Sequence, residues 1–122
     1  MAKLLPNFKF RWGLLMLQRL LPPAPPPPHP NTRPVRLVTI FWGANDAVVP
    51  EALQYVPIQE YRSNLAAMVD YVRTAHPGAA VIFITPPPVH IGKWSQHRAK
   101  QGRPMDRELA RTAEYAEAVI EV

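Results

Sequence analysis

The sequence predicts an α/β fold, part of an α/β sandwich, with one βαβ unit and a helix on each side of it in the chain. Two short apolar runs, residues 35–42 and residues 79–85, are rich in the β-branched and aromatic residues of buried parallel strands. Between them, residues 58–76 repeat apolar side chains every three or four positions, which is the spacing of a helix of about five turns. A strand, a helix and a second strand in this order predict a right-handed crossover between parallel strands.

The first part of the chain is basic. Residues 1–45 carry six Lys and Arg residues and no acid, whereas residues 46–122 carry eight basic and nine acidic residues, so the net charge of +5 arises at this end. A transit peptide would be rich in serine there, and this segment has none. Residues 12–21 place leucines at helical spacing and predict a short amphipathic helix, too short to span a bilayer. Because a secretory pattern is also missing, a cytoplasmic location is favoured.

Residues 22–34 hold half of the 16 prolines of the chain. Proline fixes φ and has no N–H to donate, so this segment is predicted to be polyproline II rather than helix or sheet. We interpret it as a linker or exposed loop, and the alternative is docking to an SH3-like partner. The chain therefore divides into residues 1–34, a helix and a Pro-rich loop, and residues 35–122, the α/β part.

A polar cluster directly follows the first predicted strand. Gly43, Ala44, Asn45 and Asp46 stand at its carboxyl end, and ligands of open α/β folds bind beyond such ends. An Asn amide has two N–H donors that stay neutral at all pH values, so Asn45 suits the stabilisation of a developing oxyanion. Gly43 permits the turn that would aim it. The alternative is a simple turn, because Gly, Asn and Asp are favoured turn residues.

The last third of the chain is predicted to be a loop followed by a helix. Residues 89–103 mix both signs of charge without periodicity, which predicts an irregular loop. Residues 105–122 predict a helix that continues to Val122, with one apolar stripe formed by Leu109, Ala113, Ala116 and Ile120. Two strands do not make a stable α/β sheet by themselves, so the pattern is typical of a piece of a domain.

Four segments taken in order resemble the middle of a GDSL-type, or SGNH, hydrolase, specifically of its isoamyl-acetate-hydrolysing esterase group. They are "VTIFWGANDAVVP", "YVPIQEYRSNLAAMVDYV", "VIFITPPPV" and "EYAEAVIEV", and the resemblance runs from about residue 7 to residue 122. It implies a flavodoxin-like three-layer α/β/α sandwich, of which residues 35–122 would be a partial SGNH hydrolase domain. It also implies hydrolysis of short- or medium-chain acyl esters, such as acetate esters, by a serine.

The resemblance assigns roles to the polar cluster. In the family's GxND block the Asn side chain donates to the oxyanion, which makes Asn45 the expected oxyanion-hole donor. Gly43 matches the glycine of that block, and Asp46 is expected to accept hydrogen bonds that hold the loop. "FRW" at residues 10–12 resembles residues shortly after the second block, whose glycine supplies a backbone N–H to the hole. That position falls near Asn7 here.

Two blocks of the family have no match within residues 1–122. The Gly-Asp-Ser block with the nucleophile would precede residue 1, and the block with an Asp and a His three residues apart would follow residue 122. Ser63 lies in a predicted helix, and Ser95 has His97 near it but no orienting acid, so neither is expected to be a nucleophile. We therefore expect these 122 residues by themselves to be inactive. The alternative is a non-catalytic interaction module that binds through its Pro-rich segment.

Neither a cofactor nor a metal is expected. The chain has no Cys, and His90, His97 and Asp106 lack the close spacing of metal-ligand pairs. The expected partner is a small acyl ester. No nucleic acid is expected, because the resemblance to the family already accounts for the Arg and the Trp of residues 10–12.

Overall fold

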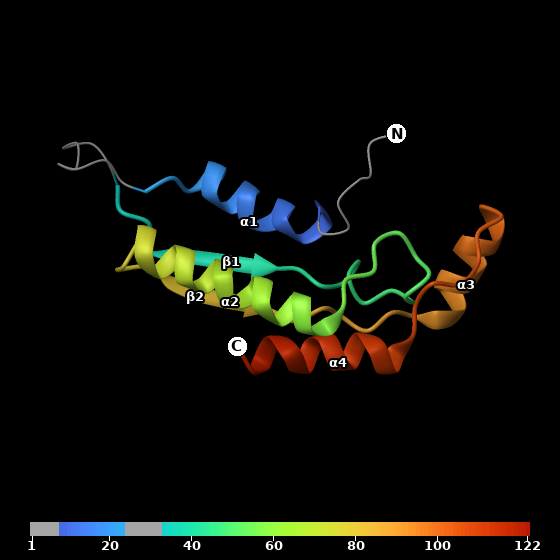
Figure 1. The fold of residues 1–122 in the computed structure, drawn as a ribbon. Coiled ribbons are helices and arrows are strands. Elements are labelled where there is room, and N and C mark those ends of the chain that lie inside the picture. Colours follow the sequence, from blue (N-terminus) through green and yellow to red (C-terminus); the bar gives the residue numbers. More distant parts are fainter. Residues whose placement is uncertain (1–7, 24–32) are drawn as a thin grey trace, which may run out of the picture.

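The computed structural model describes residues 8–23 and residues 33–122 and confirms the predicted βαβ unit (Figure 1). In chain order the elements are α1 Phe8–Leu20, β1 Leu37–Phe41, α2 Ile58–Ala75, β2 Ala80–Ile84, α3 Ile91–Lys100 and α4 Leu109–Ile120. The strands pair in parallel, with α2 as the crossover. Residues 24–32 lie outside the described residues. The two interpretations of the Pro-rich segment, a linker or an SH3 ligand, therefore stay predictions, as does the division of the chain at residue 34.

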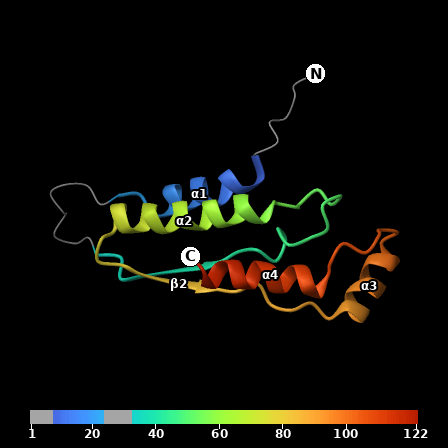
Figure 2. The ribbon, with the colours of Figure 1, turned by 60° about the horizontal axis from the view of Figure 1, so that its bottom comes forward.

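The sheet buries one face and exposes the other. Val38 and Ile40 of β1 are buried, and the residues that alternate with them are exposed, as the period of two in a strand requires. The buried face packs against α2, which lies between α1 and α4 (Figures 1 and 2). The described residues thus form a partial α/β sandwich, as predicted. The opposite face carries four apolar side chains that are 45–55% exposed, namely Leu37, Phe41, Ile82 and Ile84.

Helix α2 supplies the largest part of the core. Tyr61, Leu65, Met68 and Val72 recur at three-and-four spacing along its buried face and are each at most 1% exposed. Burying an aliphatic side chain of this size stabilises the fold by roughly 1.5–3 kcal/mol. The helix starts directly after Pro57, whose φ of −54° is compatible with the turn into a helix. The hydrophobic periodicity therefore identified both the helix and its buried face.

Helix α1 begins at Phe8, earlier than the predicted start at residue 12, and its end is attached to α2. The hydroxyl of Tyr71 donates to the carbonyl oxygen of Leu21 at 2.7 Å. Leu14 and Leu17 pack against the core, as the predicted amphipathic stripe requires. Within residues 8–23 and 33–122, every helix is too short or too polar to cross a bilayer.

The prediction of an irregular loop at residues 89–103 is wrong, because Ile91–Lys100 form helix α3. The side chain of His90 caps this helix by accepting a hydrogen bond from the backbone N–H of Lys93 at 3.3 Å. Trp94 and Arg98, one turn apart, bind the following segment: Trp94 Nε1 donates to Asp106 Oδ1 at 2.7 Å, and Arg98 Nε donates to the carbonyl of Pro104 at 2.9 Å. None of its residues is buried, so no hydrophobic period marks it.

The predicted start and buried face of the last helix are also wrong. Residues 104–108 are not helical, and Arg107 forms an antiparallel bridge with Val48 before α4 begins at Leu109. The predicted stripe fails because Leu109 and Ile120 are 52% and 77% exposed. Tyr115 enters the core instead, where its ring packs 5.0 Å from that of Tyr61 and its hydroxyl donates to the carbonyl of Val56. The buried face consists of Thr112, Tyr115, Ala118 and Val119.

Candidate active site

The loop after β1 turns sharply at Gly43. The backbone N–H groups of Asp46 and Ala47 donate to the Gly43 carbonyl at 3.1 and 2.9 Å, and Gly43 has a φ of +115°, which L-residues rarely adopt. A Cβ at this position would come within 2.5 Å of the Tyr61 hydroxyl oxygen, which itself donates to the Trp42 carbonyl at 3.0 Å. Glycine is therefore required both for the backbone conformation and for the close approach of α2.

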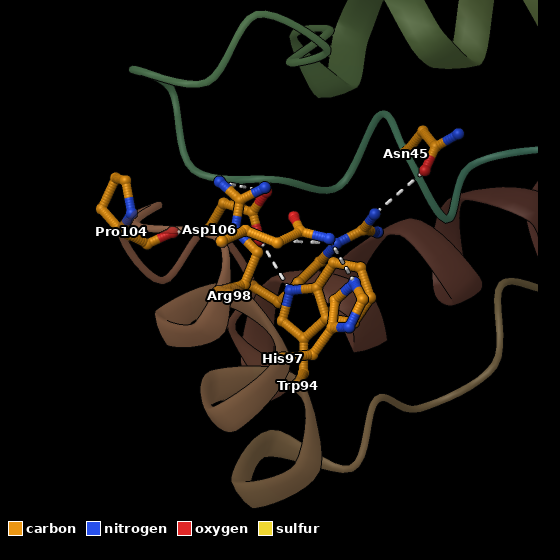
Figure 3. A network of polar contacts seen from close by, with 8 residues as sticks. Asn45, Trp94, His97, Arg98, Pro104 and Asp106 are labelled. Carbon is orange, nitrogen blue, oxygen red and sulfur yellow. Dashed lines mark hydrogen bonds and ion pairs between the residues drawn. The ribbon is translucent and has the colours of Figure 1, made fainter.

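Asn45 lies exposed on this loop, and its amide makes one hydrogen bond. Its Oδ1 accepts a hydrogen bond from Arg107 Nη2 at 2.9 Å. Because a guanidinium has only donors, the atom that faces it must be the amide oxygen. Figure 3 shows this oxygen at the dashed contact and the amide nitrogen on the opposite side. Among the described residues, none accepts a hydrogen bond from Nδ2, so both N–H groups are available to a ligand.

A cleft of about 700 Å³ lies beside the Asn45 loop. Trp12 of α1, Phe41 and Trp42 at the end of β1, and Leu53 from the loop before α2 give it apolar walls. The polar side chains that line it are Asn45, Asp46 and Gln54. Apolar walls with a few polar groups are typical of small-molecule sites. The cleft therefore offers an apolar binding surface next to the amide of Asn45.

Asp46 is a half-buried residue of the same loop. Burial raises the pKa of its carboxyl from 3.8 to about 6, although the backbone N–H groups of Asp46 and Gly43 and the charge of Arg107 act in the opposite direction. The two N–H groups fit the expected role of Asp46 as an acceptor that holds the loop, and that role stays a prediction.

Asp46 is expected to make stability fall as pH rises through the window from 3.8 to about 6. In this window the folded carboxyl binds more protons than the unfolded one, so protonation favours the folded state. Denaturant unfolding at several pH values checks this, with Asp46→Asn expected to remove the effect and Asp70→Asn, on an exposed position of α2, expected to leave it. Parallel pH profiles of the unchanged chain and Asp46→Asn would contradict the prediction.

The other sequence candidates lie away from the cleft. Ser63 is exposed on α2, where its hydroxyl donates to the Gln59 carbonyl at 2.9 Å. Ser95 and His97 are exposed on α3, and His97 lies beside Gln101 and Trp94. In the part of the chain that the structure describes, no three His, Asp or Glu residues gather as a metal site. Asn7 lies outside the described residues.

Sequence reasoning missed Arg107, which contacts Asn45 from the segment before α4. Arg107 is 9% exposed, and its guanidinium lies 5.2 Å from the centre of the Trp94 ring. Burial lowers its pKa, an effect that the neighbouring carboxylate of Asp106 opposes. No local pattern could have paired it with Asn45, because it was placed in the last helix and the bridge to Val48 joins segments far apart in the chain.

Comparisons with known proteins identify the family of this chain. The sequence model of the GDSL-like lipase/acylhydrolase family matches residues 10–121. The isoamyl acetate-hydrolyzing esterase 1 homolog of Mus musculus is 36% identical over 119 residues, which cover 95% of this chain and 46% of the relative. The Homo sapiens homolog of the same name is 33% identical over 120 residues, with the same coverage. A GDSL esterase/lipase of Arabidopsis thaliana is 38% identical over 86 residues, which are 68% of this chain and 34% of the relative.

The family match extends over nearly all of the described residues, including the βαβ unit, the Asn45 loop and Arg107. The chain spans about half the length of the mouse and human relatives that it matches. Because the family match covers residues 10–121, this chain belongs to the GDSL-like lipase/acylhydrolase family.

Proposed function

We propose that this chain forms the oxyanion-binding part of a serine ester hydrolase that acts on small acyl esters, with Asn45 as a donor to the oxyanion. The observation that carries the proposal is the orientation of Asn45. Its oxygen is bound by Arg107 at 2.9 Å, its nitrogen points the other way, and an apolar cleft lies beside it. Catalysis requires donors at the place where negative charge develops, and a held amide at the carboxyl end of a strand supplies one.

The proposed reaction is acyl transfer to a serine followed by hydrolysis. When a serine attacks the ester carbon, the carbonyl oxygen becomes an oxyanion in a tetrahedral intermediate. The Asn45 amide donates to that oxygen without losing a proton, because its N–H groups do not ionise. In the family the serine, the aspartate and the histidine belong to blocks that would align before residue 1 and after residue 122. We propose that this chain depends on residues of those blocks for the nucleophile and the general base.

Two features support a small apolar ester as the substrate. The walls of the cleft come from aromatic and aliphatic side chains, which bind a hydrocarbon group better than a charged one. The mouse relative is named as a homolog of isoamyl acetate-hydrolyzing esterase 1, and isoamyl acetate is an ester of a short acid and a branched alcohol. We propose substrates of this class for the complete site.

The proposal is tested by comparing this chain with a chimera. In the chimera, the matching segment of the mouse relative is replaced by residues 1–122, so that the relative supplies the flanking residues. The isolated chain is expected to release acetate from isoamyl acetate no faster than buffer, because it has neither the serine block nor the Asp and His block. The chimera is expected to hydrolyse the ester with saturation kinetics.

The exposed apolar face of the sheet gives this experiment a structural readout. In three-layer sandwiches both faces of the sheet are covered, and here Leu37, Phe41, Ile82 and Ile84 are exposed. The chimera should bind less of a hydrophobic dye than the isolated chain, since the added segments would cover that face. A folded chimera without esterase activity would refute the proposed function, and an active isolated chain would refute the dependence on the flanking blocks.

A further inference from the structure

We propose that Arg107 is a positioning residue that sets the orientation of the Asn45 amide and strengthens its N–H groups as donors. The inference rests on the proposed function of Asn45 as an oxyanion donor, and it adds a residue that the GxND motif does not contain. Asn45 is exposed and sits on a loop, and an exposed amide ordinarily rotates about its side-chain bonds. The hydrogen bond from Arg107 Nη2 to Oδ1, 2.9 Å long, opposes that rotation.

The backbone fixes the position of Arg107. It pairs with Val48 in an antiparallel bridge, and the neighbouring Val49 N–H donates to the carbonyl of Asp106 at 3.0 Å. These contacts attach the segment before α4 to the strand-like residues just after the Asn45 loop. These backbone contacts therefore fix the Cα of Arg107 relative to the loop that carries Asn45.

Packing fixes the side chain of Arg107 as well. Its guanidinium lies 5.2 Å from the centre of the Trp94 ring, within the range of a cation–π interaction. Trp94 is itself held by its hydrogen bond to Asp106 at 2.7 Å. The side chain of Arg107 is 9% exposed, so it has little freedom to leave Asn45. Helix α3 therefore supports the oxyanion donor through Trp94 and Arg107.

The hydrogen bond that the Arg107 side chain donates goes to Asn45, although the charges of Asp106 and Asp46 also act on its guanidinium. The Asp106 carboxylate binds Trp94 at 2.7 Å and Arg98 at 3.2 Å, whereas Arg107 Nε lies 3.9 Å from it. A cation that donates to an amide oxygen favours the resonance form with a C=N double bond and a positive nitrogen. In that form the bond to Nδ2 rotates more slowly, and its N–H groups are stronger donors.

This effect on the amide bond can be measured without any ester. Nuclear magnetic resonance on the ¹⁵N-labelled 122-residue chain resolves the two Nδ2 protons of Asn45 and the rate at which they exchange places by rotation. Arg107→Met keeps an apolar stem beside Trp94 and removes the charge and the donors. Arg107→Met is expected to raise that rate roughly tenfold. Loss of the charge-assisted hydrogen bond lowers the barrier to rotation, and a barrier lower by about 1.4 kcal/mol gives a tenfold faster rate.

Arg111→Met is the matched control. Arg111 stands four residues later, stacks at 5.9 Å over the Tyr55 ring and pairs with Glu108 at 3.4 Å, so its loss should leave the Asn45 rate unchanged. Should Arg107→Met fail to fold, Arg107→Lys takes its place, because lysine keeps the charge but lacks the forked donors and is expected to raise the rate severalfold. An Asn45 rotation rate unchanged in a folded Arg107 variant would overturn the inference.

Kinetics in the chimera separate positioning from a merely structural role. Arg107→Met is expected to lower kcat about tenfold with KM nearly unchanged, because the lost stabilisation applies to the oxyanion and not to the bound ester. A rise in KM with kcat unchanged would overturn the inference. If the chimera hydrolyses no ester, the proposed function fails, while the rotation rate still decides whether Arg107 controls the Asn45 amide.

Discussion

Asn45→Ala is expected to lower kcat for isoamyl acetate in the chimera by about 100- to 1,000-fold, which is the usual effect of removing one oxyanion-hole donor. The physical reason is that the amide interacts with the oxygen mainly when that oxygen is negative, so its loss raises the barrier more than it weakens substrate binding. KM should therefore change by much less than kcat. Asn45 is exposed on a loop, but its loss leaves Nη2 of the buried Arg107 without a hydrogen-bond partner, so stability should fall by about 1–3 kcal/mol. The rates are therefore compared at a temperature at which both chimeras are folded.

Asn45→Asp separates the donor role from simple occupancy of the position. Aspartate has nearly the same shape and can still accept the hydrogen bond from Arg107, but at neutral pH it has no N–H to donate. It also adds a negative charge where the oxyanion would form. Its kcat is expected to be at least as low as that of Asn45→Ala. Activity within threefold of the parent in either variant would show that Asn45 does not bind the oxyanion.

The local order of the fold followed from the sequence because its signals are local. The apolar composition of the two strands and the hydrophobic period of α2 can each be seen within one continuous segment. Neither depends on which distant residues the segment contacts. The GxND loop was equally local, since a glycine, an amide and a carboxylate after a strand place polar groups at its carboxyl end. The structure shows Gly43 with a positive φ at the turn of this loop.

The features that the sequence did not predict depend on contacts between distant segments. Helix α3 buries none of its residues, and its order comes from polar bonds of Trp94 and Arg98 to residues 104–106. The predicted stripe of α4 left out Tyr115, whose ring enters the core and whose hydroxyl binds the Val56 carbonyl. Arg107 reaches Asn45 across 62 residues of chain. Such pairings are a property of the assembled fold.

Gly43→Ala is expected to destabilise the protein by about 2–5 kcal/mol, the sum of two separate effects. The first is backbone strain, since φ is +115° and an L-residue there is costly. The second is a collision, because the new Cβ would meet the Tyr61 hydroxyl oxygen at 2.5 Å, and Tyr61 is fully buried with no room to retreat. Denaturant unfolding followed by tryptophan fluorescence measures the change, with Trp42 next to the substituted residue.

Substitutions at two other glycines separate the cost of backbone strain from the cost of the collision. Gly102 has a φ of +64° with open space around its Cβ position, so Gly102→Ala should cost about 1–2 kcal/mol from strain alone. Gly78 also has open space and lies outside the positive-φ region, so Gly78→Ala should change stability by less than about 0.5 kcal/mol. If Gly43→Ala cost no more than Gly102→Ala, the close approach of Tyr61 to the loop would be refuted.

The collision term can then be isolated with Tyr61→Phe, which removes the oxygen that the new Cβ would meet. In the unchanged chain this substitution should cost about 1 kcal/mol, because the Trp42 carbonyl loses a hydrogen bond of 3.0 Å. In the Gly43→Ala background it should cost less or even stabilise, since relief of the collision offsets the lost bond. The two substitutions are therefore expected to be less damaging together than their separate costs predict. That coupling would mean that α2 sets the position of the loop from which Asn45 projects.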